Sequence, residues 1–131
     1  MTTRKSETSD TELEILKALW DHGAGTVREL KVVLKKAGRH WAYTTVQTLL
    51  NRLEAKGYVK SDKAGFAHVF HPTVTRDKLM RQRLKDLANE LCDGAATPLV
   101  LALVDGQRFT PEELEQFRRL LDDLEKRKRK S

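Results

Sequence analysis

Residues 41–59 read WAYTTVQTLLNRLEAKGYV, and this segment carries the strongest fold signal in the chain. Apolar side chains recur in it at helical spacing: Val46, Leu49, Leu50 and Leu53. We expect a helix that begins near Tyr43 and is closed by Gly57. Its other face carries hydroxyls, amides and an arginine. A surface helix that binds no ligand more often displays Glu, Lys and Ala. The segment therefore predicts a helix that packs on one side and contacts a polar ligand on the other.

Two further helices are predicted before this segment. Ser9 and Glu12 have capping-box spacing, in which each side chain bonds the exposed backbone amide of the other residue. Thr26 and Glu29 repeat the same spacing. Apolar residues at helical intervals follow both boxes, so a first helix should run to about His22 and a second should follow Thr26.

A β-hairpin is predicted after the third helix. Residues 58–63 and 67–72 contain β-type side chains with partial alternation, and Ala64-Gly65 between them supplies a tight turn. Three helices followed by a hairpin, with the third helix basic and polar on one face, are typical of a winged helix-turn-helix. The predicted fold class is mainly α with a small β-hairpin wing.

From Thr75 onward the apolar spacing is helical again and predicts three more helices. Their apolar stripes have no partner in so small a first domain, which predicts a C-terminal helical module that forms a homodimer. The alternative is that these helices fold back and complete an intrachain core. We expect a winged-helix DNA-binding domain over residues 9–74, a dimerisation module over 75–126, and flexible tails at 1–8 and 127–131. The side chains expected in the dimer interface are Leu79, Leu84, Leu87, Leu91, Leu99, Leu103, Leu114, Phe117, Leu121 and Leu124.

Positive charge is concentrated in the first predicted domain. The chain has a net charge of +6 and a pI near 9.6, and residues 28–63 hold nine Lys/Arg against three Asp/Glu. This segment alone accounts for the excess, and a basic segment inside a folded region favours a polyanion such as nucleic acid.

The third helix supplies the groups that read double-stranded DNA. Hydroxyls and amides can bond base edges in the major groove, where the N-terminal part of a recognition helix lies. An alternative role for Thr44 or Thr45 is to cap the helix, and Arg52 could be solvated. The expected base contacts are Tyr43, Thr44, Thr45, Gln47 and Thr48. The expected contacts of the DNA backbone and wing are Arg28, Lys31, Arg39, Arg52, Lys60, Lys63 and His68.

Other chemistry lacks a motif in this sequence. His68 and His71 fall on opposite faces of the expected strand, with no cysteine or carboxylate at ligand spacing, so no metal site is expected. The single Cys92 excludes an internal disulfide and suits a reducing compartment. We find no phosphate loop, nucleophile motif, signal peptide or apolar run long enough for a membrane span. We therefore expect a non-enzymatic protein without cofactors that works in the cytoplasm, on the nucleoid.

Together these residues resemble the BlaI/MecI family of penicillinase repressors. Residues 41–59 are similar to the family's pattern of Trp, a small residue, Thr-Val/Ile, Thr-Leu, Arg-Leu and Lys-Gly. Residues 12–20 are similar to its first helix, and residues 98–114 to its dimer region. The resemblance implies a winged helix, a helical dimerisation module and repression through palindromic operators. It places Thr44, Thr45, Gln47 and Thr48 where the family's recognition helix meets DNA.

Three departures from the family pattern bear on specificity and release. The best-known members carry Lys and Arg where this chain has Thr44 and Gln47, which implies a different base preference. The Asn-Phe bond that is cut in members answering to β-lactams corresponds to Ala102-Leu103, so release by that cleavage is not expected. Copper-responsive relatives carry a Cys-x-Cys pair, whereas this chain has Cys92 alone. The resemblance thus assigns neither an inducing sensor nor a protease.

The leading hypothesis is a sequence-specific repressor that binds a palindromic operator as a homodimer, with the third helix in the major groove. One alternative is a winged helix that binds a partner protein, against which the polar face of the third helix argues. Another is an architectural nucleoid protein, which would show steep salt dependence and little difference between DNA sequences.

Overall fold

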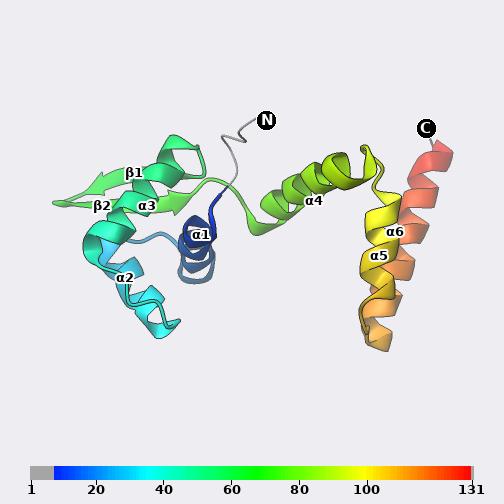
Figure 1. Cartoon of the computed structure of the whole chain (residues 1–131), viewed down its shortest axis with the longest axis horizontal. Helices are drawn as coiled ribbons and strands as arrows, with labels where there is room; N and C mark the ends of the chain where they lie inside the picture. Colours follow the sequence, from blue (N-terminus) through cyan, green and yellow to red (C-terminus); the bar gives the residue numbers. More distant parts are fainter. Residues whose placement is uncertain (1–7, 131) are drawn as a thin grey trace. The chain divides into compact units, whose positions relative to one another are not determined.

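The structure is a computed structural model that describes residues 8–130, apart from the side chains of Ala64 and Lys130 (Figure 1). Of the flexible tails expected at residues 1–8 and 127–131, residues 1–7 and Ser131 lie outside the described residues, whereas Thr8 is buried and is not part of an open tail. The chain divides into two compact units, one that ends at Gln82 and one that begins at Arg83. Its elements are α1 (Asp10–His22), α2 (Val27–Lys36), α3 (Tyr43–Ala55), β1 (Val59–Ala64), β2 (Ala67–Pro72), α4 (Arg76–Cys92), α5 (Thr97–Asp105) and α6 (Pro111–Lys130).

The three-helix core of the first unit confirms the helices predicted for it. Both capping boxes form: the amide of Glu12 donates to Ser9 Oγ at 3.2 Å, and the amide of Ser9 donates to Glu12 Oε1 at 2.9 Å. Thr26 and Glu29 make the same pair of bonds at 3.2 and 2.9 Å. The side chains with no exposed surface come from all three helices: Ile15, Leu16, Leu19, Leu30, Val46, Leu50 and Leu53. Burial of each contributes about 1.5–3 kcal/mol to stability, which fixes how the three helices face one another.

The hairpin packs against this core through Val59 and Phe70. Gly25, in the loop between α1 and α2, exchanges two backbone hydrogen bonds with Phe70, at 3.1 and 2.8 Å. The fold is therefore a winged helix-turn-helix, as the sequence predicts, with the wing tied to the start of α2.

The turn of the hairpin is one residue further along than the sequence predicts. Ala64 pairs with Ala67, so the two-residue turn is Gly65-Phe66 and not Ala64-Gly65. Gly65 has φ 66°, whereas φ of Phe66 is not positive. This is the pattern of a type II′ turn, which requires glycine at its first central position.

The second unit is helical as expected. The start of α5 and the end of α6 differ from the prediction. Thr97, predicted to cap the helix, is its first residue, and the N-cap is Ala96 without a side-chain bond. The last helix continues to Lys130, through residues expected in the C-terminal tail. Lys and Arg are good helix formers and are favourable near a helix C-terminus, which explains the extension.

The start of α4 belongs to the first unit. Trp20 Nε1 donates to the carbonyl of Val74 at 2.8 Å, and Arg76 pairs with Asp21 at 3.0 Å. Val74 and Leu79 lie in the core of the winged helix. The prediction that Leu79 lies in a dimer interface is therefore wrong, because the first unit already buries this side chain.

Among the described residues from Arg83 onward, Ala88 is the single buried side chain. A T-shaped contact between Phe109 and Phe117, with ring centroids 4.9 Å apart, joins the start of α6 to the loop before it. The large apolar side chains left exposed are Leu84, Leu87, Leu91, Val100, Leu101, Leu103, Val104, Leu114, Leu120, Leu121 and Leu124. As a single copy this unit has helices without a core.

Within the described part of the chain, none of the helices taken singly has the length and apolar content of a membrane span. The pair α4 and α5, bent by 102° at the break between them, meets the length and composition criteria only when joined.

One buried ion pair joins the start of α1 to the end of α3. Lys56 Nζ lies 2.7 Å from Glu12 Oε1, and the exposed fractions of the two side chains are 26% and 2%. Glu12 Oε2 is buried without a hydrogen-bond partner in the described residues. Burial raises the pKa of Glu12, but hydrogen bonds from Lys56 and Ser9 outweigh it and hold the pKa below the ordinary value.

We predict that Glu12→Gln lowers the free energy of unfolding at neutral pH by about 2 kcal/mol, the scale of a lost charged hydrogen bond in a buried site. Gln keeps the capping-box geometry, so the change isolates the ion pair. Because the folded pKa of Glu12 is lowered, its contribution is complete above the unfolded pKa of about 4.3 and is lost as pH falls through the folded pKa. Denaturant unfolding over an acid pH series measures both effects.

Glu14→Gln is the matched control for this experiment. Glu14 makes longer pairs with Lys17 and Arg39, at 3.8 and 3.7 Å, nearer to solvent. It should change stability by less than about 1 kcal/mol. Equal losses in both variants would show that burial of the Glu12 pair contributes nothing.

Candidate nucleic-acid interface

The polar side chains in the first turn of α3 do not cap the helix. The N-cap residue is Ala42, and no side chain caps the helix, so the alternative role of Thr44 or Thr45 as a cap is wrong. Both threonines and Thr48 are exposed, and 46% of Tyr43 is exposed. These side chains are held on a rigid helix and are open to a ligand.

Gln47 is positioned by a neighbour on the same face. Its Nε2 donates to Asn51 Oδ1 at 3.0 Å, one helical turn along. The side chain is half-buried, in contrast to the threonines around it. The bond to Asn51 orders the Gln47 amide before any ligand arrives and leaves its oxygen as the acceptor.

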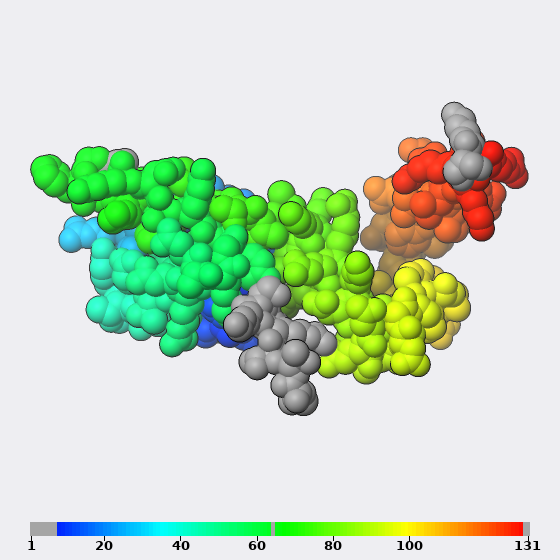
Figure 2. Space-filling view, turned by 90° about the horizontal axis from the view of Figure 1, so that it is seen from above, coloured from blue at the N-terminus to red at the C-terminus, as the bar shows by residue number. Residues whose placement is uncertain are grey.

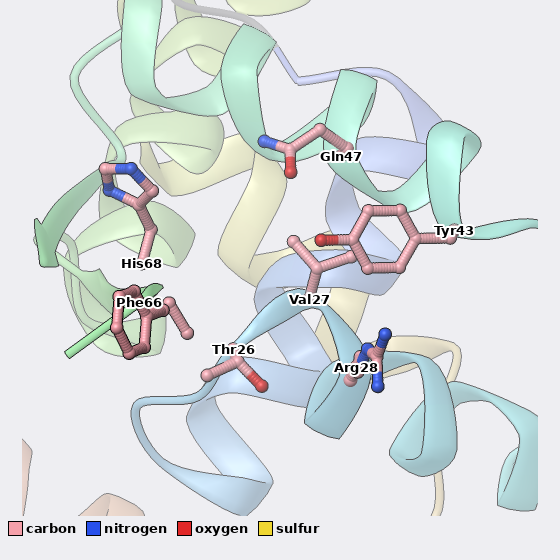
Figure 3. A pocket seen from close by; sticks show the side chains of 8 residues that line it. Thr26, Val27, Arg28, Tyr43, Gln47, Phe66 and His68 are labelled. Carbon is pink, nitrogen blue, oxygen red and sulfur yellow. The ribbon is translucent and has the colours of Figure 1, made fainter. Parts of the chain in front are cut away.

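A groove brings α3, the start of α2 and the wing tip together (Figure 3). In Figure 3, Tyr43 and Gln47 form one wall, Phe66 and His68 another, and Thr26 and Arg28 the third. Val27 and Ala67 complete the lining, which contains no acidic residue. The expected contacts Arg28, Tyr43, Gln47 and His68 thus meet at one site, although they are far apart in the sequence.

A second, basic hollow lies at the junction of α2 and α3. It is lined by Lys31, Lys35, Arg39, His40, Trp41 and Ala42. The expected backbone contacts Lys31 and Arg39 therefore lie together but outside the main groove. Arg39 Nη2 also lies 3.7 Å from Glu14 Oε1, which holds the guanidinium near α1.

The three basic residues predicted on the wing, Lys60, Lys63 and His68, do not all lie on one face of the hairpin. Lys63 and His68 pair directly across the hairpin and share one face, whereas Lys60 pairs with His71. Side chains alternate between faces along a strand, so Lys60 lies on the opposite face from Lys63. His71 Nε2 also lies 3.1 Å from Asp62 Oδ2 on that outer face.

Hydrogen bonds fix the wing relative to α3. Glu54, in the last turn of α3, accepts from the backbone amide and the hydroxyl of Ser61, at 3.1 and 2.7 Å. The hydroxyl of Thr73 donates to the carbonyl of Gly57 at 2.5 Å. The recognition face and the wing therefore form one preorganised surface.

The start of α2 has fewer free donors than an uncapped helix. The amides of Thr26 and Glu29 are used within the capping box. Hydrogen bonds from the backbone and hydroxyl of Thr26 lower the pKa of Glu29, so its carboxylate stays ionised beside Arg28. A phosphate here would be bound mainly by the exposed Arg28.

Sequence reasoning missed eight residues that line these two surfaces: Thr26, Val27, Phe66 and Ala67 in the groove, and Lys35, His40, Trp41 and Ala42 in the basic hollow. Lys35 and His40 could have been found from charge alone, since both lie beside predicted contacts. Thr26 was predicted only to cap α2. Phe66 lay outside both predicted strands and outside the predicted turn, whereas in the structure it is the second residue of the turn. Among residues 8–130, no three His, Cys, Asp or Glu side chains gather as a metal site.

Comparison with known proteins agrees with this geometry. A family model described as "Penicillinase repressor" matches residues 8–123. The chain is 27% identical to the penicillinase repressor of Bacillus licheniformis, over 92% of this chain and 94% of that protein. It is 23% identical to the methicillin resistance regulatory protein MecI of Mammaliicoccus sciuri, over 93% and 98%. The solution structure of the DNA-binding domain of the repressor BlaI is 31% identical, with a TM-score of 0.50, and covers 59% of this chain and 93% of that one.

We predict that Thr45→Ala combined with Arg52→Ala lowers affinity for duplex DNA by about a hundredfold, since each lost contact is worth roughly 1–3 kcal/mol. Both side chains are exposed, so the fold should persist, which circular dichroism would verify. Fluorescence anisotropy with labelled duplex measures affinity, and Lys17→Ala, on an exposed part of α1, is the control. Unchanged affinity in the double variant would show that this face of α3 does not bind DNA, and would favour the alternative that it binds a partner protein.

Proposed function

The chain belongs to the penicillinase repressor family, and we propose that it represses transcription as a homodimer that binds a palindromic operator through α3. The family is one of DNA-binding repressors rather than enzymes. The single observation that carries the proposal is the acid-free groove in which Tyr43 and Gln47 of α3 meet Arg28 and His68. With DNA as the ligand, the protein would work on the nucleoid in the cytoplasm.

The arrangement of side chains supports sequence reading as well as attraction. Cations line the edges of the surface, where phosphates would lie, and neutral donors and acceptors line α3. Phosphate contacts position a protein on DNA, whereas base contacts specify the sequence. Thr44 and Gln47 are uncharged, so the base preference proposed here depends on hydroxyl and amide bonds.

The second unit supports a homodimer because its helices lack a core. Leu121 is 60% exposed and Leu103 59% exposed, and apolar surface on this scale is normally covered in a stable protein. A second copy of the same unit would bury it by an isologous contact. Two winged helices joined in this way would meet two half-sites related by a two-fold axis, which is a palindrome.

The charges along α6 favour an antiparallel pairing with the second copy. Apolar residues spaced by three and four form one stripe on the helix: Leu114, Phe117, Leu121 and Leu124. Pairing this stripe antiparallel puts Leu114 opposite Leu124 and Phe117 opposite Leu121. Arg118 then lies beside Glu125 of the second copy, and Glu113 lies beside Arg127. The helix is self-complementary in this direction.

We predict specific binding to DNA upstream of the gene that encodes this chain. The preference over scrambled DNA should reach about a thousandfold at physiological salt. Changing one half of the palindrome should remove most of this preference, because only one winged helix then finds its half-site. Titrations over a salt series, read by anisotropy, give the measurement. Equal affinities that vanish together as salt rises would favour an architectural protein instead.

Charge reversal on α6 tests the homodimer. We predict that Arg118→Glu and Glu125→Arg each weaken dimerisation by about tenfold, because each places like charges together on both sides of the two-fold axis. An equal mixture of the two variants should form heterodimers of normal stability, since opposite charges face each other again. Sedimentation velocity over a dilution series measures the weakening, and native mass spectrometry identifies the heterodimer.

Arg119→Glu is the matched control for Arg118→Glu. Both arginines pair with Glu115 within α6, at 3.5 and 3.6 Å, but Arg119 lies on the side of the helix opposite the apolar stripe. It should leave dimerisation unchanged. Normal dimerisation of Glu125→Arg would contradict the antiparallel pairing, and a monomeric full-length protein would contradict the homodimer itself.

A further inference from the structure

Phe66 is an apolar side chain at the tip of the wing with no structural role there. It is fully exposed, while the other hairpin aromatic, Phe70, is buried in the core. The two residues beside it in the turn and strand are Gly65 and Ala67, so little else projects at the tip. In Figure 2 the hairpin projects from the surface of the first unit. A phenyl ring presented to water in this way is available for a ligand.

Backbone pairing reaches the tip of the hairpin. Backbone pairing continues to Ala64 and Ala67, directly beside the type II′ turn. The base of the hairpin is fixed by the Glu54–Ser61 bonds and by the bridge between Gly25 and Phe70. The ring is therefore presented at a defined place relative to α3, and binding would cost little conformational entropy.

The surroundings of Phe66 are basic. His68 shares the groove with it, Lys63 pairs with His68 across the strands, and Arg28 stands on the facing wall. An aromatic ring near Lys63 and Arg28, beside a helix with hydroxyl and amide side chains, fits a nucleic acid better than it fits an apolar protein surface.

From this placement we propose that Phe66 is a minor-groove wedge: its ring inserts at a base step beside the major groove that α3 reads. Apolar side chains inserted in this way partly unstack the step and kink the duplex toward the major groove. Pyrimidine–purine steps unstack most easily, so Phe66 selects for them at a fixed distance from the α3 contacts. The wing thereby reads sequence through DNA deformability, in addition to the direct contacts of α3. This inference rests on the proposed function, because α3 positions the wing.

The test uses full-length protein and a duplex from the upstream DNA that the protein protects, with 2-aminopurine placed in turn at each step near the wing. Wild-type protein should raise the fluorescence at one step in each half-site. Phe66→Ala should abolish the rise and weaken binding by about tenfold, the scale of one base-level contact. Phe66→Leu should keep most of the signal, because leucine also serves as a wedge.

Two further variants separate a wedge from general effects. Val32→Ala removes an exposed apolar side chain of α2 that does not line the groove, and it should behave as wild type. Phe66→Arg should recover affinity through phosphate contacts without recovering the fluorescence signal. A wild-type complex without increased fluorescence at any step, or equal signals from wild type and Phe66→Ala, would overturn the wedge.

A scrambled duplex distinguishes this inference from the proposed function. If wild-type protein binds both duplexes equally, the sequence-specific repressor fails, but the fluorescence still decides on the wedge, since insertion needs only a bound duplex. If the upstream duplex is preferred and Phe66→Ala matches wild type, the wedge alone fails.

Discussion

The rotation of α3 about its own axis is the constraint on which the rest of the structure depends. Val46, Leu50 and Leu53 are fully buried against α1 and α2, and a rotation by one residue would expose them. The buried stripe therefore dictates that Tyr43 and Gln47 face the groove and that the threonines face solvent. Stability and recognition are linked because they use opposite sides of one helix.

Charged side chains are divided in the same way, with carboxylates bonded inside the fold and basic residues exposed at the groove. The buried carboxylate of Glu12 and the carboxylate of Glu54 are both used internally, by Lys56 and Ser61, so neither opposes a polyanion at the groove. The Glu54 bonds also anchor the wing, which makes an acidic residue of α3 part of the scaffold for a basic surface. Arg28 and His68 are left exposed on two of the groove walls.

The two units differ in how far they bury their apolar side chains. The winged helix completes a core within one chain, to which Val74 and Leu79 contribute. The helices from Arg83 onward bury Ala88 among the described residues and leave a row of leucines open. In the proposed dimer, folding of the second unit and pairing of two DNA-reading heads would be a single event, so that affinity for a palindrome depends on protein concentration.

The sequence by itself determined the elements, because capping boxes and apolar periodicity are local: Ser9 with Glu12 and Thr26 with Glu29 bond as their spacing predicts. It also identified α3 as the helix with one buried apolar face and one polar, exposed face. Only the tertiary structure decided the rest. Leu79 packs into the first core although its spacing suits either unit, since periodicity shows that a side chain is buried but not against what. The groove that joins Arg28, Gln47 and His68, and the place of Phe66 at its edge, depend on hairpin register and on long-range packing, which no local pattern encodes.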